Sequence, residues 1–317
     1  MKHILHLLIS LFGRLFAKQK LSILIYHQVL EEHDGMRLGE PTAKQFSWQM
    51  ALLAKYFTPI SLNDALQALK TKSLPKNAVC ITFDDGYIDN LILAAPILKR
   101  FDIPATIYIA TSFSSGENMF NDRIIDLMGD NSLTAFNLSA VELGQQKVDD
   151  EQARRSLCRQ VIGKVKYLTI SERKRIISRL YADNKVNEYP RKMMTELQIK
   201  ELSEFDIDIG AHTVDHPILK TLTSEEQKKQ IIQSKLWLEN LIEKPVSNFA
   251  FPNGKLDEDY SLETVRLVEE AGFSSAVSTN IGVSNSTTDG FQLNRFTPWD
   301  NNPIKFHLRL LRNQINI

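Results

Sequence analysis

Short apolar or alternating segments that end in polar residues recur along the chain, and most are followed by a segment with helical spacing. These segments predict buried strands over residues 21–29, 78–83, 104–110, 205–211, 246–251, 273–278 and 291–297. Apolar positions three and four apart predict helices over residues 46–56, 63–70, 88–100, 224–242 and 262–271. Alternating strands and helices are typical of parallel βα units. We therefore expect one barrel-like α/β domain that covers residues 21–317.

The segment at about 114–195 breaks this alternation. It is polar and charged, and it predicts amphipathic helices over residues 152–168 and 171–181 but no strands. We interpret it as a helical insertion into the barrel. Its part from 151 to 200 is rich in arginine and lysine, which usually marks solvated helix faces. A basic patch that faces an acidic polymer or a membrane is the alternative.

Residues 1–20 predict a separate amphipathic helix. One side carries an apolar stripe, made of Ile4, Leu7, Leu8, Leu11, Phe12 and Leu15. The run is shorter than the roughly 20 residues that span a bilayer, and Arg14 interrupts it. With Lys2, Arg14, Lys18 and Lys20 nearby, the helix suits peripheral contact with anionic lipid; equally, the stripe suits packing against the domain. A signal peptide fits less well, because no small-x-small cleavage site follows Phe16.

Composition excludes several classes of protein. The chain has 317 residues, 43% of them hydrophobic, and 38 basic residues balance 38 acidic ones. This is the range of globular enzymes, and a net charge of zero gives no reason to expect a nucleic-acid partner. Cys80 and Cys158 stand far apart, so they form neither a disulfide framework nor a CxxC metal motif.

Two carboxylates directly follow the predicted strand 78–83, in the sequence Asp84-Asp85-Gly86. In parallel α/β folds, ligands bind at the carboxyl ends of strands, so this is the usual place of an active site. Taken alone, the tripeptide also describes a tight turn in which an aspartate caps the next helix.

Two histidines lie four residues apart in the sequence HTVDHP, at the end of another predicted strand. His212 and His216 can direct both imidazoles at one ion, and neutral imidazole is the commonest metal ligand in proteins. Together with one aspartate of the first motif they make three protein ligands with open positions, the pattern of catalytic zinc. Asp215 between them suits a local capping role better than ligation.

Three further segments lie at predicted strand ends and therefore on the same edge of the sheet. They are Tyr26-His27, the turn Phe251-Pro252-Asn253-Gly254, and Arg295. A turn is the default interpretation of Pro and Gly, but its position makes it a plausible wall of the same pocket.

These motifs resemble those of the NodB-type polysaccharide deacetylases, carbohydrate esterase family four. TFDDGY at 82–87 and HTVDHP at 212–217 resemble the family's first two motifs, and FPNG at 251–254 resembles the third. The early YHxV-like strand, YHQV at 26–29, resembles the arrangement in bacterial exopolysaccharide and biofilm deacetylases. The likeness covers about residues 22–299, apart from the insertion.

The resemblance implies a fold and a set of roles. The fold is a distorted (β/α)7 barrel of the NodB homology type. The implied roles are Asp85, His212 and His216 as metal ligands, Asp84 as general base, and His27 as general acid. The backbone N–H of Tyr87 would hold the oxyanion, and the expected substrate-contacting residues are Tyr87, Pro252, Asn253, Gly254 and Arg295.

The sequence departs from the family in two places. The third motif often begins with arginine, and Ala250 stands there in this chain. We hypothesise that Arg295 orients Asp84 instead. No late Leu-x-His motif stands out, which leaves His307 as a spare candidate for the acid.

The implied reaction is metal-dependent removal of N-acetyl groups from GlcNAc residues of a bacterial exopolysaccharide or its lipid-linked precursor. Zinc is the first choice of metal, with cobalt, nickel, manganese or iron as alternatives. O-deacetylation, another amide substrate, or a non-catalytic polysaccharide-binding protein are the other possibilities. An uncleaved amphipathic start suits an enzyme on the cytoplasmic face of the inner membrane, and a periplasmic location is the alternative.

Overall fold

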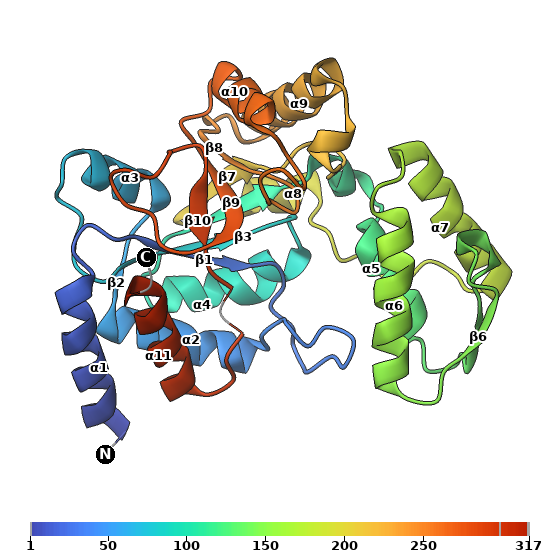
Figure 1. The fold of residues 1–317 in the computed structure, drawn as a ribbon, viewed down its shortest axis with the longest axis horizontal. Coiled ribbons are helices and arrows are strands. Elements are labelled where there is room, and N and C mark those ends of the chain that lie inside the picture. Colours follow the sequence, from blue (N-terminus) through green and yellow to red (C-terminus); the bar gives the residue numbers. More distant parts are fainter. Residues whose placement is uncertain (1, 298, 316–317) are drawn as a thin grey trace.

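A computed structural model describes residues 2–297 and 299–315, without the side chains of Lys2 and His3. Outside the described residues lie Met1, Pro298 and residues 316–317. The first residue of the expected helix 1–20 and the last two of the expected domain 21–317 are among them. The side chain of Lys2, which was expected to contribute positive charge, is not described either. Seven parallel strands follow one another around the molecule (Figure 1): β1 (Ser22–Tyr26), β3 (Ala78–Phe83), β4 (Ala105–Ile109), β7 (Ile207–Ala211), β8 (Asn248–Ala250), β9 (Ser275–Ile281) and β10 (Leu293–Arg295).

The ring of strands closes through the residue that follows β10. Phe296 donates its N–H to the Ile23 carbonyl at 2.8 Å and accepts from the Ile25 N–H at 3.0 Å. The first and last strands are thus joined, and the expected distorted (β/α)7 barrel is confirmed. A short strand, β2 (Thr58–Pro59), pairs with β3 outside the ring.

Three neighbouring strands of the barrel are buried at every position. β1, β3 and β4 read SILIY, AVCITF and ATIYI, and none of these residues is exposed. Continuous apolar sequence is what a parallel strand covered on both faces requires. At the carboxyl end of β1, Tyr26 stacks on Phe83 of β3, and Phe46 closes the cluster edge-on.

Helices cover the outside of the barrel (Figure 1). They are α2 (Ala43–Tyr56), α3 (Leu62–Lys70), α4 (Ala95–Arg100), α8 (Glu196–Leu202), α9 (Ser224–Ile242) and α10 (Leu262–Glu270). Capping boxes start several of them; Thr223 and Glu226 exchange bonds at α9, for example. The helix expected over 88–100 is π-helical from Asn90 to Ala94 and becomes α-helical around Pro96, which has no N–H to continue the ladder.

The insertion forms a unit with its own hydrophobic cluster (Figure 1). It contains α5 (Phe120–Gly129), β5 (Ala135–Asn137), β6 (Gln145–Lys147), α6 (Glu151–Val165) and α7 (Ile170–Asn184). The expectation of an insert without strands is wrong, because β5 and β6 pair as an antiparallel hairpin. These strands have three residues each, and β6 reads Gln-Gln-Lys, so no apolar alternation announces them.

Part of the insert's basic charge is used inside it. Arg154 donates to the carbonyls of Met128 and Asp130, and the guanidinium of Arg173 lies 4.2 Å from the centre of the Phe120 ring. These two side chains are buried and hold the unit together. Other basic residues of the run are exposed, as the interpretation of solvated helix faces expects; they are Arg159, Lys164, Lys174, Arg175 and Arg179.

Two terminal helices, α1 (Lys2–Phe16) and α11 (Pro303–Ile315), lie side by side at the end of the molecule remote from the insert (Figure 1). The expected N-terminal helix is present. The alternative in which its apolar stripe packs against the domain is wrong, because the stripe is exposed, whereas His6, Ile9, Ser10 and Gly13 are buried. Among the described residues, no helix has the length and apolar character needed to cross a membrane.

Candidate active site

The turn after β3 places two carboxylates at the carboxyl end of the barrel. Asp85 has a φ of 77° and Gly86 a φ of 90°, and a Cβ on Gly86 would come within 2.9 Å of Ile109. Asp84 N–H donates to the Tyr26 carbonyl at 3.0 Å, which ties the turn to β1. The turn therefore needs its glycine, and it presents Asp84 and Asp85 side by side.

The two histidines lie on a compact loop after β7. His212 continues the strand ladder by donating its N–H to the Ile109 carbonyl at 3.0 Å. Thr213 and His216 have φ values of 66° and 49°, and the Thr213 hydroxyl accepts from the His216 N–H at 3.1 Å. The loop brings the imidazole centres to 4.8 Å from each other.

Asp85, His212 and His216 converge on one point. Asp85 Oδ1 lies 3.4 Å from His212 Nε2 and 3.5 Å from His216 Nε2. The ligand atoms of the three residues all lie within 4.8 Å of one another, as a shared metal ion would require.

The surroundings of these three side chains fit a metal. Asp85 Oδ1 is buried and bonded to no described group, an arrangement that is costly unless a ligand satisfies it. His212 donates from Nδ1 to the Ala250 carbonyl at 2.7 Å, which leaves the Nε2 lone pair directed at Asp85. A carboxylate with two imidazoles is a donor set of catalytic zinc sites.

The charge states also suit ligation. Burial opposes ionisation of Asp85, but the imidazoles of His216 and His212 outweigh it and hold the pKa of Asp85 below its usual range. Burial lowers the pKa of His216 to about 3, against the opposing effect of Asp85. At neutral pH the site thus holds an ionised carboxylate and a neutral imidazole, the forms that bind metals.

Asp84 is held by a buried arginine. Arg295 Nη1 and Nη2 each lie 2.7 Å from one oxygen of Asp84, and Arg295 is only 1% exposed. Its Nε donates to the Ser278 carbonyl at 2.7 Å. Burial opposes ionisation of Asp84, but the guanidinium outweighs it and lowers the pKa of this carboxyl. Position 250 holds alanine rather than arginine, and Arg295 on β10 is the arginine that pairs with Asp84 in this chain.

His27 follows β1 on the same edge of the barrel and lines a cavity of about 300 Å³. Burial by itself lowers the pKa of His27, but the carboxylates of Asp85, Glu40 and Asp84 outweigh it and the net pKa is raised. The backbone at His27 is fixed by Asn90, whose amide donates to the His27 carbonyl at 2.8 Å. The imidazole therefore favours its protonated form more than an isolated histidine does.

Buried acids around this cavity escaped the sequence analysis. Glu40 accepts from the Gln28 N–H at 3.1 Å, and burial raises the pKa of Glu40. Asp122 of α5 accepts from the Tyr87 hydroxyl at 2.6 Å and from Arg37 at 2.8 Å. Neither acid stands in a motif, and no strand pattern precedes either one, so only their spatial neighbours reveal them.

Tyr87 is fixed on both sides of its peptide. Ile88 N–H donates to the Lys192 carbonyl at 2.7 Å, and Met194 N–H donates to the Gly86 carbonyl at 3.0 Å. This antiparallel bridge between Tyr87 and Met193 does not use the Tyr87 N–H itself.

The FPNG turn lies directly after Ala250, whose carbonyl accepts from His212. Asn253 and Gly254 have φ values of 58° and 76°, and a Cβ on Gly254 would come within 2.9 Å of the Thr279 backbone nitrogen. The turn is thus packed against β9, and contact of Pro252, Asn253 and Gly254 with substrate stays a prediction.

Two other candidates lie elsewhere. His307 is buried in α11 beside His6 and Phe57, away from the strand ends, so it does not serve as a spare acid. Asp215 accepts from the Gln230 side chain at 2.8 Å, and its carbonyl accepts from Arg173, in line with a local role.

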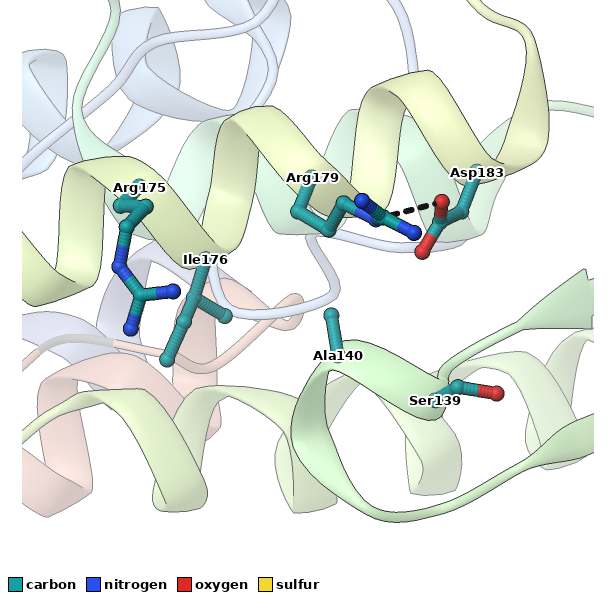
Figure 2. A pocket seen from close by; sticks show the side chains of 6 residues that line it. All are labelled: Ser139, Ala140, Arg175, Ile176, Arg179 and Asp183. Carbon is teal, nitrogen blue, oxygen red and sulfur yellow. Dashed lines mark ion pairs between the residues drawn. The ribbon is translucent and has the colours of Figure 1, made fainter.

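A cavity of about 660 Å³ lies in the insert, between α7 and the turn that contains Ser139 (Figure 2). Arg179 points toward Asp183 and pairs with it at 2.7 Å, and Arg175 and Ile176 complete this side (Figure 2). The cavity shares no residue with the strand ends, so we do not place the chemistry there.

A closed (β/α)7 barrel with three side chains that could hold a metal ion and an adjacent carboxylate is an arrangement typical of hydrolases. The family model described as polysaccharide deacetylase matches residues 71–160 and 168–276. The chain belongs to this family, whose members hydrolyse acetyl groups from carbohydrate and are generally metal-dependent.

The chain is also similar to individual proteins, and the solved structures among them share its fold. The chain is 24% identical over 278 residues to the Bacillus subtilis protein YxkH, whose name describes it as a polysaccharide deacetylase. The match covers 87% of this chain and 70% of YxkH. The Streptococcus pyogenes deacetylase PplD, solved in complex with acetate, superposes with a TM-score of 0.61 at 20% identity, covering 92% of this chain and 98% of PplD. IcaB from Ammonifex degensii superposes with a TM-score of 0.58 at 16% identity, covering 94% of this chain and 97% of IcaB.

Proposed function

We propose that this chain removes N-acetyl groups from GlcNAc residues of a bacterial exopolysaccharide or its lipid-linked precursor. The observation that carries the proposal is the buried Asp84–Arg295 pair, which lies directly beside the Asp85, His212 and His216 cluster. Simple binding of a sugar gives no reason to hold an ionised carboxylate beside three ligand atoms.

Asp85, His212 and His216 would hold a divalent cation, with zinc as first choice and cobalt, nickel, manganese or iron as alternatives. When bound, such an ion lowers the pKa of a water molecule and polarises a carbonyl oxygen. The Ala250 carbonyl supports this role, because it fixes the His212 tautomer.

Asp84 serves as the general base in this proposal. It takes a proton from water as the water oxygen bonds to the acetyl carbon. Arg295 keeps Asp84 ionised and aimed; because it is buried against Asp84, we give it a positioning role rather than substrate contact. The Tyr87 N–H, free of the bridge to Met193, would donate to the oxygen that gains negative charge.

His27 serves as the general acid. The C–N bond breaks as the sugar nitrogen takes the proton from His27, which gives a free amine and acetate. The acids that surround His27, Glu40 among them, favour the protonated imidazole that this step requires. Pro252, Asn253 and Gly254 would form part of the wall that holds the sugar.

The same groups could cleave an O-acetyl ester, since the attacking water and the base are identical. We favour the amide, because an amine leaving group needs a proton and a protonated His27 would supply it, whereas an alkoxide leaves more readily unaided. A non-catalytic polysaccharide-binding role is disfavoured by the intact base and ligand set.

We further propose a peripheral location on the cytoplasmic face of the inner membrane, with a periplasmic location as the alternative.

A free amine carries positive charge, so the reaction would turn a neutral polymer cationic and alter its adhesion to acidic surfaces.

The test is acetate release from N-acetylglucosamine oligomers by the metal-reconstituted protein and by Asp84→Asn. We expect the variant to lose activity by roughly a thousandfold, within the range attributed to general bases, while it still binds one metal ion. Asp215→Asn is the matched control, since Asp215 bonds only outside the cluster, and it should stay active. An active Asp84→Asn protein would refute the mechanism, and an inactive wild-type protein that binds metal would refute the substrate.

A further inference from the structure

Helix α1 docks on the barrel with a face inward that consists of Ile9 and of small or polar residues. The Ser10 hydroxyl donates to the Tyr56 carbonyl at 3.0 Å, and the His6 ring stacks on His307. Gly13 lies so close to α11 that a Cβ there would be 3.3 Å from Leu311. The apolar side of the helix consequently faces away from the protein.

This outward side is a large apolar surface. On α1, Leu15 is 72% exposed, Ile4 62% and Leu8 58%. Helix α11 runs parallel to α1, since His6 lies beside His307 and Gly13 beside Gln314. It adds two exposed apolar residues next to these contacts, Leu308 and Ile315. We use the term two-helix face for the exposed apolar residues of the two helices, which are Ile4, Leu5, Leu7, Leu8, Leu11, Phe12, Leu15, Phe16, Leu308 and Ile315.

Ten such side chains exceed what a monomeric protein leaves in water without a purpose. No described residue of the chain covers them. Their exposure would favour association with an apolar phase or with another apolar surface.

Positive charge borders the two-helix face. Arg14 and Lys18 are exposed beside the stripe on α1, and Lys305 and Arg312 are exposed on α11. Residues 1–30 and 301–317 contain no aspartate or glutamate, although the whole chain is electrically neutral. The border is therefore complementary to an anionic surface.

We propose that the two-helix face docks on an anionic lipid bilayer, with its leucine and phenylalanine side chains among the acyl chains and its cations at the phosphates. The helix has 15 residues, about 22 Å, and so lies in the interface rather than across it. A second copy suits this face less well. Two-fold pairing would bring both sets of cations together with no carboxylate of either helix to match them.

The docking also sets the direction of the active site. Ser10 accepts from Asn77, which immediately precedes β3, whereas Asp84 follows the other end of that strand, about 20 Å away. The insert, too, lies at the far end of the molecule from α1 (Figure 1). A docked enzyme would hold its catalytic residues away from the bilayer. This last step rests on the deacetylation proposed above. An active site held away from the bilayer favours a polymer strand as substrate over a sugar that is attached to a lipid at the level of the headgroups.

Co-sedimentation of the full chain with vesicles tests the docking without any need for activity. We expect binding to vesicles of equal parts phosphatidylcholine and phosphatidylglycerol, and weaker binding to phosphatidylcholine alone. Leu8→Glu combined with Leu15→Glu should weaken binding by roughly tenfold or more, because two charges would enter the apolar layer. The matched control is Leu197→Glu with Leu262→Glu, since these leucines on α8 and α10 are also more than half exposed, and it should bind normally.

A second pair of variants tests the cationic border. Arg14→Gln with Lys18→Gln should weaken binding to the anionic vesicles by about fivefold per charge and leave phosphatidylcholine unaffected. If the leucine variant binds the anionic vesicles as strongly as the wild-type protein does, the proposal is overturned. A dimer detected by light scattering that the leucine variant abolishes, without vesicle binding, would assign the face to a second copy instead.

The orientation is tested with a fluorophore on an introduced cysteine, since Cys80 and Cys158 are buried. A label at Leu11→Cys should be quenched by brominated lipid, and a label at Lys174→Cys in the insert should not. Quenching at position 174 would contradict the orientation while leaving the docking itself intact. Loss of acetate release in the leucine variant in free solution would indicate misfolding, which circular dichroism would detect independently.

Discussion

At the scale of single residues, the site depends on one buried ion pair. Arg295 on β10 and Asp84 after β3 lie 211 residues apart in the sequence, and both are nearly inaccessible to water. Breaking such a pair leaves an uncompensated charge in the interior, which typically costs about 3–5 kcal/mol. The pair therefore links stability to the ionisation of the proposed base.

Replacing Arg295 should reveal this link. In Arg295→Met the pKa of Asp84 should rise, because burial opposes ionisation and the guanidinium that outweighed it is gone. The acidic limb of the pH–rate profile for acetate release should therefore move to higher pH, and Arg295→Lys should restore part of the shift. Arg309→Met, which removes an arginine paired with Asp300 far from the site, is the control. An unshifted limb in Arg295→Met would contradict the positioning role.

At the scale of elements, α1 is attached to the barrel through histidines. His6 Nδ1 and His307 Nδ1 lie 2.9 Å apart, so one of the rings donates and the other accepts. Tyr56 stacks beside His6, and Phe57 packs against His307. This contact requires at least one neutral imidazole, which makes the attachment of α1 sensitive to acid.

Acid should consequently destabilise the attachment. Burial, and then the neighbouring His6, lower the pKa of His307 from 6.5 to about 4. The unfolded chain thus binds a proton at a higher pH than the folded chain does, and stability is lost as the pH falls from about 6.5 toward 4. Denaturant unfolding at a series of pH values should show this decline, and His307→Gln should show a shallower one. Equal slopes in both proteins would show that this pair does not titrate as described.

At the scale of the whole molecule, the insert is fastened to the catalytic end of the barrel. Arg37, in the loop after β1, bonds to Asp122 at 2.8 Å and to Asp126 at 2.7 Å, both on α5. Tyr87, just past the carboxylate turn, bonds to the same Asp122. The insert thus helps to form the cavity beside His27, although it interrupts the barrel in sequence.

Removal of the metal should abolish activity without unfolding the protein. The barrel is closed by backbone hydrogen bonds around the ring, and the three ligands lie on turns at its edge, so the fold does not depend on them. We expect a chelator to stop acetate release while the circular dichroism spectrum stays unchanged, and zinc or cobalt to restore it. The metal should also raise the melting temperature, since it binds the folded state. Full activity in the chelator would refute metal dependence.

The sequence by itself predicted the barrel and the position of its motifs. Continuous apolar strands that end in Asp84-Asp85 and in His212 are local patterns, and strand ends in a parallel barrel must share one edge. The family assignment followed from the same residues. The hairpin of the insert and helix α8 were missed because they are short. Helix α11 was also missed, although it has 13 residues and an amphipathic pattern.

Only the tertiary structure could decide which groups meet across the barrel. The partnership of Arg295 with Asp84, the role of the Ala250 carbonyl, and the acids around His27 join residues far apart in the chain. The same holds for α1. Its sequence defined an apolar stripe, but the direction of that stripe depends on the shape of the surface that receives the helix. Local pattern determines which element forms and which side is apolar, whereas burial and pairing depend on neighbours that the fold alone supplies.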